Sequence, residues 1–233
     1  MDWEVFATRM GAMARDLLEQ KSVDTTLERI TASAVEIVEG CDAAGILILK
    51  SPLVHSLAPT EGLVVQSDEL QQRLGEGPCF EAAGPGNVER IFRIENLTSY
   101  QDRWPGYATA VSGLGVGSMM GFLLYTDAEE LGTLNLYSRR PAAFTAASEN
   151  AGLLLASHAA VAFSSARNAE QLHRALSTRH TIGEAMGMIM ERHKLSQDDA
   201  FSVLRQLSQE RNTKLHDIAR HVCETGRIDG SAG

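Results

Sequence analysis

The segment ALSTRHTIGEAMGMIMERHKLSQDDAFSVLRQLSQERNTKLHDIARHV (175–222) predicts an all-helical C-terminal part of the chain, because its apolar residues recur at helical spacing. A long helix without Pro is predicted upstream, from Thr145 onward. Ser196 predicts the start of a second helix through a capping-box-like motif, and Thr213 predicts the cap of a third, which ends at Gly226. Three helices of this size predict a compact all-α bundle, whose first helix continues the long one.

The preceding part of the chain alternates between helical and strand patterns. Apolar spacing predicts one helix over residues 3–20 and a second that begins after Asp24 and stops at Gly40. In chain order, the later elements are strands at 43–50, 54–60 and 62–67, a short helix capped by Ser67, a Gly/Pro-rich loop at 75–87, a strand near 89–94, a helix near 100–112, and a hairpin of strands at 118–126 and 131–138. This order predicts an α+β sandwich with a mostly antiparallel sheet between helices. We therefore expect two domains, 1–165 and 166–233, joined by the long helix.

Composition and charge restrict the class of protein. The chain has 233 residues, of which 44% are apolar and 22% are charged, as expected for a globular protein with one ordinary core and a smaller second one. An acidic N-terminal start and the lack of a long apolar run predict neither a signal peptide nor a membrane span. Three widely spaced cysteines suit a reducing cytoplasm.

The net charge of −9 is unevenly distributed along the chain. Residues 1–165 carry 11 Lys and Arg against 21 Asp and Glu, whereas residues 166–233 carry 10 against 9. This is the balance expected if only the C-terminal part approaches phosphates, although a simple difference in composition gives the same numbers.

The C-terminal segment resembles the ANTAR domain of transcription antitermination regulators over nearly the whole predicted bundle. The resemblance rests on Ile182–Gly183…Ala185–x–Gly187–x–x–Met190, on the helix with Ala200 and Leu204, and on Arg211–Asn212–x–Lys214–Leu215…Ala219. Two positions depart from the family: Met186 stands where a lysine is common, and Ser208 replaces a common alanine. The first departure bears on RNA contact, whereas the second is expected to be a tolerated packing change.

Residues from about 22 to 165 resemble a GAF domain of the kind fused to ANTAR in actinobacteria. The GEGPC loop (75–79), RWP (103–105) and the LGTLNLYS strand carry this resemblance. The order of the two domains implies a sensor joined to an RNA-binding output. The resemblance further implies that the protein binds paired stem-loops with short loops in nascent RNA and so prevents a terminator from forming. It would act on the transcription complex indirectly and catalyse no reaction.

Candidate RNA-binding residues come from this match and from side-chain chemistry. Small residues at 183, 185 and 187 allow close approach to the helix backbone, yet a glycine inside a helix costs roughly 0.5–1 kcal/mol relative to alanine. Either an RNA loop lies against this face or the helices of the bundle pack tightly there. The motif places residues 211–214 next to the 183–187 surface, at a helix N-terminus whose free N–H groups suit phosphate. The candidates are Arg179, Gly183, Met186, Gly187, Arg192, Lys194, Arg205, Arg211, Asn212 and Lys214.

Candidate sensor residues are Cys79, in a loop able to wrap a ligand, together with Arg103, Trp104, Tyr125 and Tyr137. Cys79 is either a redox-sensitive thiol or, as free cysteines more often are, a small buried hydrophobe. The aromatic residues either line a pocket or belong to the core. The sequence names no cofactor. It leaves three signals open: a small-molecule ligand, a redox change, and a haem or metal held by a single histidine that follows no motif.

Two rival functions follow from other readings of the same residues. A DNA-binding regulator would need several Arg, Asn or Gln residues on one exposed face of the third helix, where residues 213–225 offer only Lys214 and Arg220. An enzyme is disfavoured because the sequence has no HExxH, GxSxG, Walker loop or CxxC, and its histidines follow no metal-ligand spacing.

A heptad frame through the long helix predicts a homodimer. One core position of this seam receives Leu154, Val161, Asn168, Ala175, Ile182 and Ile189, and the other receives His158, Ser165, Leu172, Arg179 and Met186. Because several of these residues are polar, the seam alone is weak, and we expect the GAF domains to add contact area.

Overall fold

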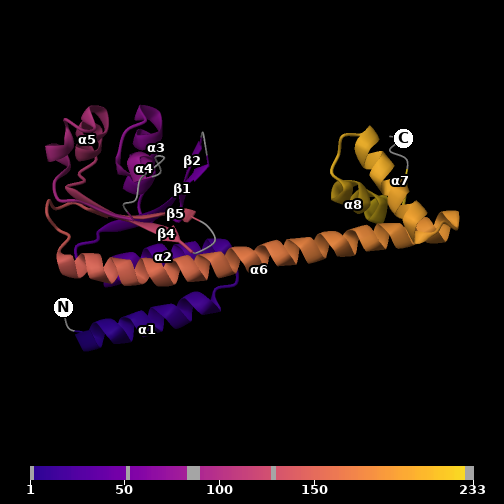
Figure 1. Cartoon of the computed structure of the whole chain (residues 1–233), viewed down its shortest axis with the longest axis horizontal. Helices are drawn as coiled ribbons and strands as arrows, with labels where there is room; N and C mark the ends of the chain where they lie inside the picture. The colour runs from indigo at the N-terminus through magenta and orange to yellow at the C-terminus, as the bar shows by residue number, and fades with distance from the viewer. Residues whose placement is uncertain (1–2, 51–52, 83–89, 127–129, 229–233) are drawn as a thin grey trace. The chain divides into compact units, whose positions relative to one another are not determined.

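The computed structural model describes residues 3–50, 53–82, 90–126 and 130–228 (Figure 1). The chain divides into two compact units, Met1–Arg167 and Asn168–Gly233. Among the described residues, no helix combines the length and apolar character needed to cross a membrane. The same residues contain no cluster of three or more His, Cys, Asp or Glu side chains able to hold a metal ion.

A five-stranded antiparallel sheet forms the centre of the first unit, in the order β2-β1-β5-β4-β3 (Figure 1). The strands are β1 (Ala43–Lys50), β2 (Leu53–Leu57), β3 (Ile91–Ile94), β4 (Ser118–Tyr125) and β5 (Glu130–Ser138). The predicted hairpin is formed by β4 and β5, with Phe122 opposite Leu134.

Helices cover both faces of this sheet (Figure 1), which confirms the predicted α+β sandwich. One face packs Met120 and Phe122 against α1 (Trp3–Glu19), α2 (Val23–Ile37) and the first part of α6 (Ala146–His193). The other face turns Met119 and Tyr137 toward α3 (Gly62–Leu74), α4 (Pro78–Ala82), the 3-10 helix η1 (Leu97–Tyr100) and α5 (Pro105–Gly113). Adjacent residues of one strand serve opposite cores because side chains alternate across a sheet.

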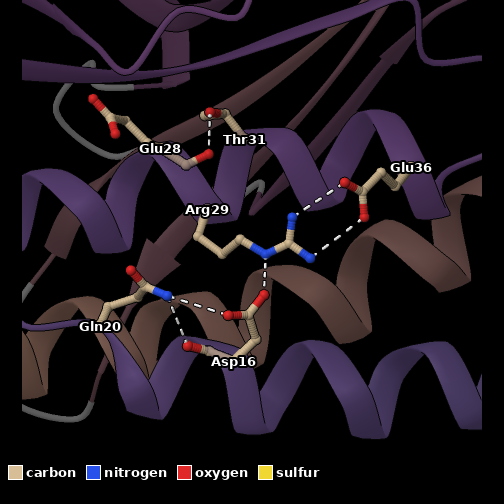
Figure 2. Close-up of polar contacts among 6 residues, drawn as sticks. All are labelled: Asp16, Gln20, Glu28, Arg29, Thr31 and Glu36. Atoms are coloured by element: carbon tan, nitrogen blue, oxygen red, sulfur yellow. Dashed lines mark hydrogen bonds and ion pairs between the residues drawn. The ribbon is translucent and has the colours of Figure 1, made fainter.

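An ion-pair network links α1 to α2 (Figure 2). The Arg29 guanidinium on α2 donates from Nε to Asp16 on α1 and from Nη1 to Glu36 at 3.1 Å. These three side chains are between 30% and 57% exposed, so solvent screens their attraction. We therefore assign the docking of α1 chiefly to its buried apolar side chains, which are Phe6, Met10, Met13 and Leu17.

Several local predictions for the first unit are wrong. Residues 62–67, predicted as a strand, lie inside α3, so Ser67 is not a helix cap but a buried residue whose hydroxyl bonds to that of Tyr107 at 2.9 Å. Helix α2 is capped by Ser22 rather than Asp24. The 75–87 loop contains the short α4, and residues 83–89 of it lie outside the described part of the chain. The helix near 100–112 begins at Pro105.

The end of α6 forms the predicted three-helix bundle with α7 (Gln197–Glu210) and α8 (Leu215–Thr225). Ser196 caps α7 as predicted, and its Oγ accepts the Asp199 N–H at 3.2 Å. The predicted Thr213 cap of α8 is wrong, because the N-cap residue is Lys214 and no side chain bonds the free N–H groups there. Helix α8 ends at Gly226, whose φ of +67° favours glycine. The buried core consists of Ala185, Ile189, Ala200, Leu204, Ile218, Ala219 and Val222.

Candidate nucleic-acid interface

A groove of about 540 Å³ lies between α6 and the start of α7 within the second unit. Its walls are Arg179, Ile182, Gly183, Met186, Gly187 and Met190 of α6 with Gln197, Asp198 and Phe201 of α7. Four predicted RNA-binding residues therefore share one concave surface, because their spacing places them on one face of α6. They are Arg179, Gly183, Met186 and Gly187.

The two glycines of this groove are not explained by packing. Gly183 and Gly187 are exposed, and a Cβ added to either would meet no heavy atom within 4 Å beyond its chain neighbours and the backbone of its own helix. Ala185, which lies between them, is the small residue that the bundle core buries. Each glycine lowers helix stability by roughly 0.5–1 kcal/mol relative to alanine. Exposed backbone in the wall of a groove is the arrangement expected where a binding partner approaches closely.

Met186 lies on the same wall, partly buried against the edge of the bundle core. A lysine stem at this position would follow the same wall and carry its ammonium group to solvent. The departure from the family pattern therefore removes a positive charge from the groove and leaves the bundle core in place.

Three of the predicted cationic residues have free side chains. The side chains of Arg179, Arg205 and Lys214 are exposed and form no ion pair or hydrogen bond within the described part of the chain. Arg179 is the one that lines the groove. Free guanidinium and ammonium groups keep their full capacity for phosphate contacts.

The other three cationic residues are engaged within the bundle. Arg192 donates from Nη1 to the Gly226 carbonyl, and Arg211 donates from Nη2 to the Ile228 carbonyl at 3.5 Å. Both arginines thus hold the segment that follows α8. Lys194 pairs with Glu191 at 3.4 Å.

Asn212 has a conformational reason for its identity. Its φ of +49° is left-handed, a region that asparagine tolerates better than most residues other than glycine. Its N–H closes the turn after α7 by donating to the Gln209 carbonyl at 3.3 Å. Residues 211–214 do not line the groove, so the predicted juxtaposition with the 183–187 surface is not found there.

The predicted heptad seam is wrong in its second half. Ile189 is buried in the core of its own bundle and cannot face a second copy, and Ile182 packs partly against the same core. Earlier on α6, Leu154, Val161 and Leu172 are 44%, 65% and 62% exposed, so an apolar face remains open.

A buried polar layer lies between the sheet and α3 in the first unit. Cys79 donates its N–H to Gln71 Oε1 at 3.0 Å, and its sulfur accepts hydrogen bonds from Gln71 Nε2 at 3.4 Å and Asn135 Nδ2 at 3.2 Å. Burial raises the pKa of the Cys79 thiol to about 12. A fully buried, protonated thiol fits the buried-hydrophobe interpretation better than a redox-sensitive one.

Asp68 is the residue of this layer that the sequence analysis missed. Its carboxyl is buried and accepts a hydrogen bond from the Tyr137 hydroxyl at 3.3 Å, whereas Oδ2 has no partner among the described residues. Burial raises the pKa of Asp68 to about 6. Helical periodicity over 64–71 would have revealed the site, because Val64, Ser67, Asp68 and Gln71 form one buried face of α3.

The predicted sensor residues do not all meet. Cys79, Trp104 and Tyr137 are buried on the α3–α5 side of the sheet. Arg103 lies at the surface, where its Nε donates to Glu81 at 3.1 Å. Tyr125 is 37% exposed at the end of β4. A pocket on this side would therefore use three of the five residues.

Comparison with known proteins covers both units. The GAF domain family matches residues 20–164, and the ANTAR domain family matches residues 170–222. Similar solved structures include the GAF domain of a phosphoenolpyruvate-protein phosphotransferase (ptsP) from Coxiella burnetii, with 16% identity and a TM-score of 0.56 over 73% of this chain and 99% of that chain. The Stigmatella aurantiaca phytochrome photosensory core module has 10% identity and a TM-score of 0.59 over 89% of this chain and 45% of that chain. Such identities show the fold alone. No curated protein matches the chain.

Proposed function

Because the chain belongs to the GAF domain family and carries a C-terminal ANTAR domain, we propose that it is a signal-responsive transcription antiterminator. It is a GAF-containing regulator with an RNA-binding ANTAR domain. In this proposal the second unit, Asn168–Gly233, which we call the ANTAR unit, holds paired stem-loops of a nascent transcript and prevents a terminator from forming. The first unit, Met1–Arg167, which we call the GAF unit, receives the signal. The protein acts in the cytoplasm, and no reaction is catalysed.

The observation that carries this proposal is the open groove of the ANTAR unit. Gly183 and Gly187 expose helix backbone without serving the packing of the bundle, and Arg179 lines the same surface with a free guanidinium group. Hairpin loops present splayed bases, which contact such surfaces through their faces and edges, while guanidinium groups bind the flanking phosphates.

Duplex DNA is the alternative partner, and the side chains of α8 disfavour it. A recognition helix needs several free polar side chains on one face. Arg220 of α8 is engaged with Asp217 at 3.0 Å and with His216. Lys214, at the N-cap, is then the remaining free cation of this region within the described residues. The groove, by contrast, lies on α6 and α7.

We further propose that the protein acts as a homodimer paired along α6. Leu154, Val161, Leu172 and Leu176 are 44–65% exposed and recur at helical spacing on one face. Exposed apolar side chains that recur along one face of a long helix are typical of helix pairing. Two copies would bring two ANTAR units to one RNA, and the second hairpin would then bind at a raised effective concentration.

A filter-binding series on the full chain tests the RNA partner. We expect two-hairpin RNA to bind more tightly than one-hairpin RNA, with an affinity that falls as salt rises. Equal affinity for duplex DNA would overturn the proposal. Transcription in vitro across a terminator preceded by two hairpins should show more read-through when the protein is added. Light scattering tests the dimer, and a monomer mass at micromolar protein would exclude it.

A further inference from the structure

We propose that Phe201 of α7 is the stacking surface for one unpaired base of an RNA hairpin loop, which enters the groove between α6 and α7. The inference rests on the proposed function and names the part of the RNA that this groove takes. Three features of the groove support it: a spare aromatic ring, room beside it, and the arrangement of charge.

Phe201 lies outside the buried core of the bundle. The core side of α7 is formed by Ala200, Val203, Leu204 and Leu207. Phe201 is 39% exposed and is not a member of that core cluster. The ring lines the groove together with the apolar side chains of Ile182 and Met186, and part of it stays open to solvent. Aromatic rings in this position are the usual stacking platforms for unpaired bases.

The groove has room for a planar ring beside Phe201. Its volume of about 540 Å³ falls within the range of sites that hold small organic groups. On the α6 wall, Gly183 and Gly187 offer backbone without a Cβ. A base that stacks on Phe201 could thus approach the α6 backbone closely. The two glycines and the exposed ring then have one explanation.

Charge around the groove suits a nucleotide with its base inside and its phosphates outside. Arg179 lies one helical turn before Gly183 on α6, and Arg205 lies one turn after Phe201 on α7. Both side chains are exposed and form no ion pair or hydrogen bond among the described residues, and Arg179 lines the groove itself, so both are available for phosphate contacts. Asp198 on the wall would repel a phosphate but accepts N–H groups. The groove therefore suits a base that turns an N–H donor edge toward this wall.

Abasic substitution in the hairpin loop, combined with Phe201→Ala, tests this inference by filter binding on the full chain. Stacking of one base on an aromatic ring corresponds to about a 5- to 150-fold change in affinity. We expect Phe201→Ala to weaken binding by a factor in this range. Removal of the base at one loop position should weaken the binding of that RNA to the unaltered protein, but should not further weaken its binding to Phe201→Ala. Phe201→Tyr should bind normally.

Two further variants separate stacking from a folding defect. Met188→Ala is the matched control, because Met188 is 38% exposed on α6 but lies outside this groove, and it should keep full RNA affinity. Gly187→Ala should raise the melting temperature of the bundle yet weaken binding, since the added methyl group meets no protein atom.

The outcomes distinguish this inference from the proposed function. No RNA binding by the unaltered protein would refute the proposed function itself. Normal RNA binding by a folded Phe201→Ala, or abasic losses that persist in that variant, would overturn the role of Phe201 alone. If light scattering gave Phe201→Ala a smaller mass than the unaltered protein while its RNA affinity stayed the same, the groove would instead be assigned to contact between copies of the chain.

Discussion

Replacing Asp68 with asparagine should stabilise the GAF unit at neutral pH. The folded protein raises the pKa of this carboxyl from 3.8 to about 6, mainly because burial penalises its charged form. The raised pKa means that the stabilisation contributed by the protonated carboxyl is fully present below about pH 4 and is lost as pH rises through about 6. A shift of roughly two units corresponds to about 3 kcal/mol at neutral pH. Asp68→Asn keeps the shape and removes the charge, so it should recover up to about 3 kcal/mol there.

Urea unfolding followed by tryptophan fluorescence measures this effect in the right unit, because both tryptophans, Trp3 and Trp104, belong to Met1–Arg167. The free energies of unfolding of the two proteins should agree near pH 4 and diverge up to about pH 7. Glu69→Gln, which alters an exposed carboxyl on the same helix, should leave the pH dependence unchanged. Parallel curves for Asp68→Asn and the unaltered protein across this range would refute the assignment.

Three further predictions concern the ANTAR unit. Asn212→Gly should keep both bundle stability and RNA affinity, because glycine accepts the left-handed φ. Asn212→Ala should lower the stability of the bundle by about 1 kcal/mol, measured by thermal unfolding. Loss of RNA affinity in a stably folded Asn212→Gly would show that the amide contacts a base. Combined alanine substitution of Arg179 and Arg205 should weaken RNA binding and lower the slope of log affinity against log salt by about 1 per lost contact. Arg211→Ala should chiefly lower the stability of the bundle, because Arg211 holds the segment after α8. The reverse pattern would contradict the division of the cations into free and engaged ones. Met186→Lys should tighten RNA binding and steepen the same slope, and unchanged filter-binding curves would place the RNA away from this wall.

The fold could be predicted from the sequence wherever the spacing of apolar residues was compatible with only one kind of secondary structure. The hairpin strands and the helices of the bundle carry clear periodicity and turn signals, and they form as predicted. Residues 62–67 were misassigned because a run with Val64 and Val65 suits a strand locally. The helix there is favoured by burial: only a 3.6-residue period brings Val64, Ser67 and Gln71 together against the sheet.

The residues of the α6 wall of the groove could be predicted from the sequence, whereas the part that α7 contributes could not be predicted as fully. Helical spacing alone puts Arg179, Gly183 and Gly187 on one face of α6, as found. On α7, Ala200, Val203, Leu204 and Leu207 recur at i, i+3, i+4 and i+7, so helical spacing puts Ala200 on the buried stripe and Phe201 beside it, as found. The groove next to Phe201 follows from the packing of α7 against α6, which spacing within one helix does not give.

The weak heptad pattern of α6 has a physical explanation in its three environments. Leu155 and Phe163 are buried in the sandwich, and Ala185 and Ile189 are buried in the bundle, so each end of the helix follows the demands of a different core. Between them, the stretch with Leu172 has no core of its own chain to pack against among the described residues. If a second copy covers this stretch, a signal that alters pairing would change binding to two hairpins and leave binding to one hairpin unaffected, since only the linked event depends on two ANTAR units.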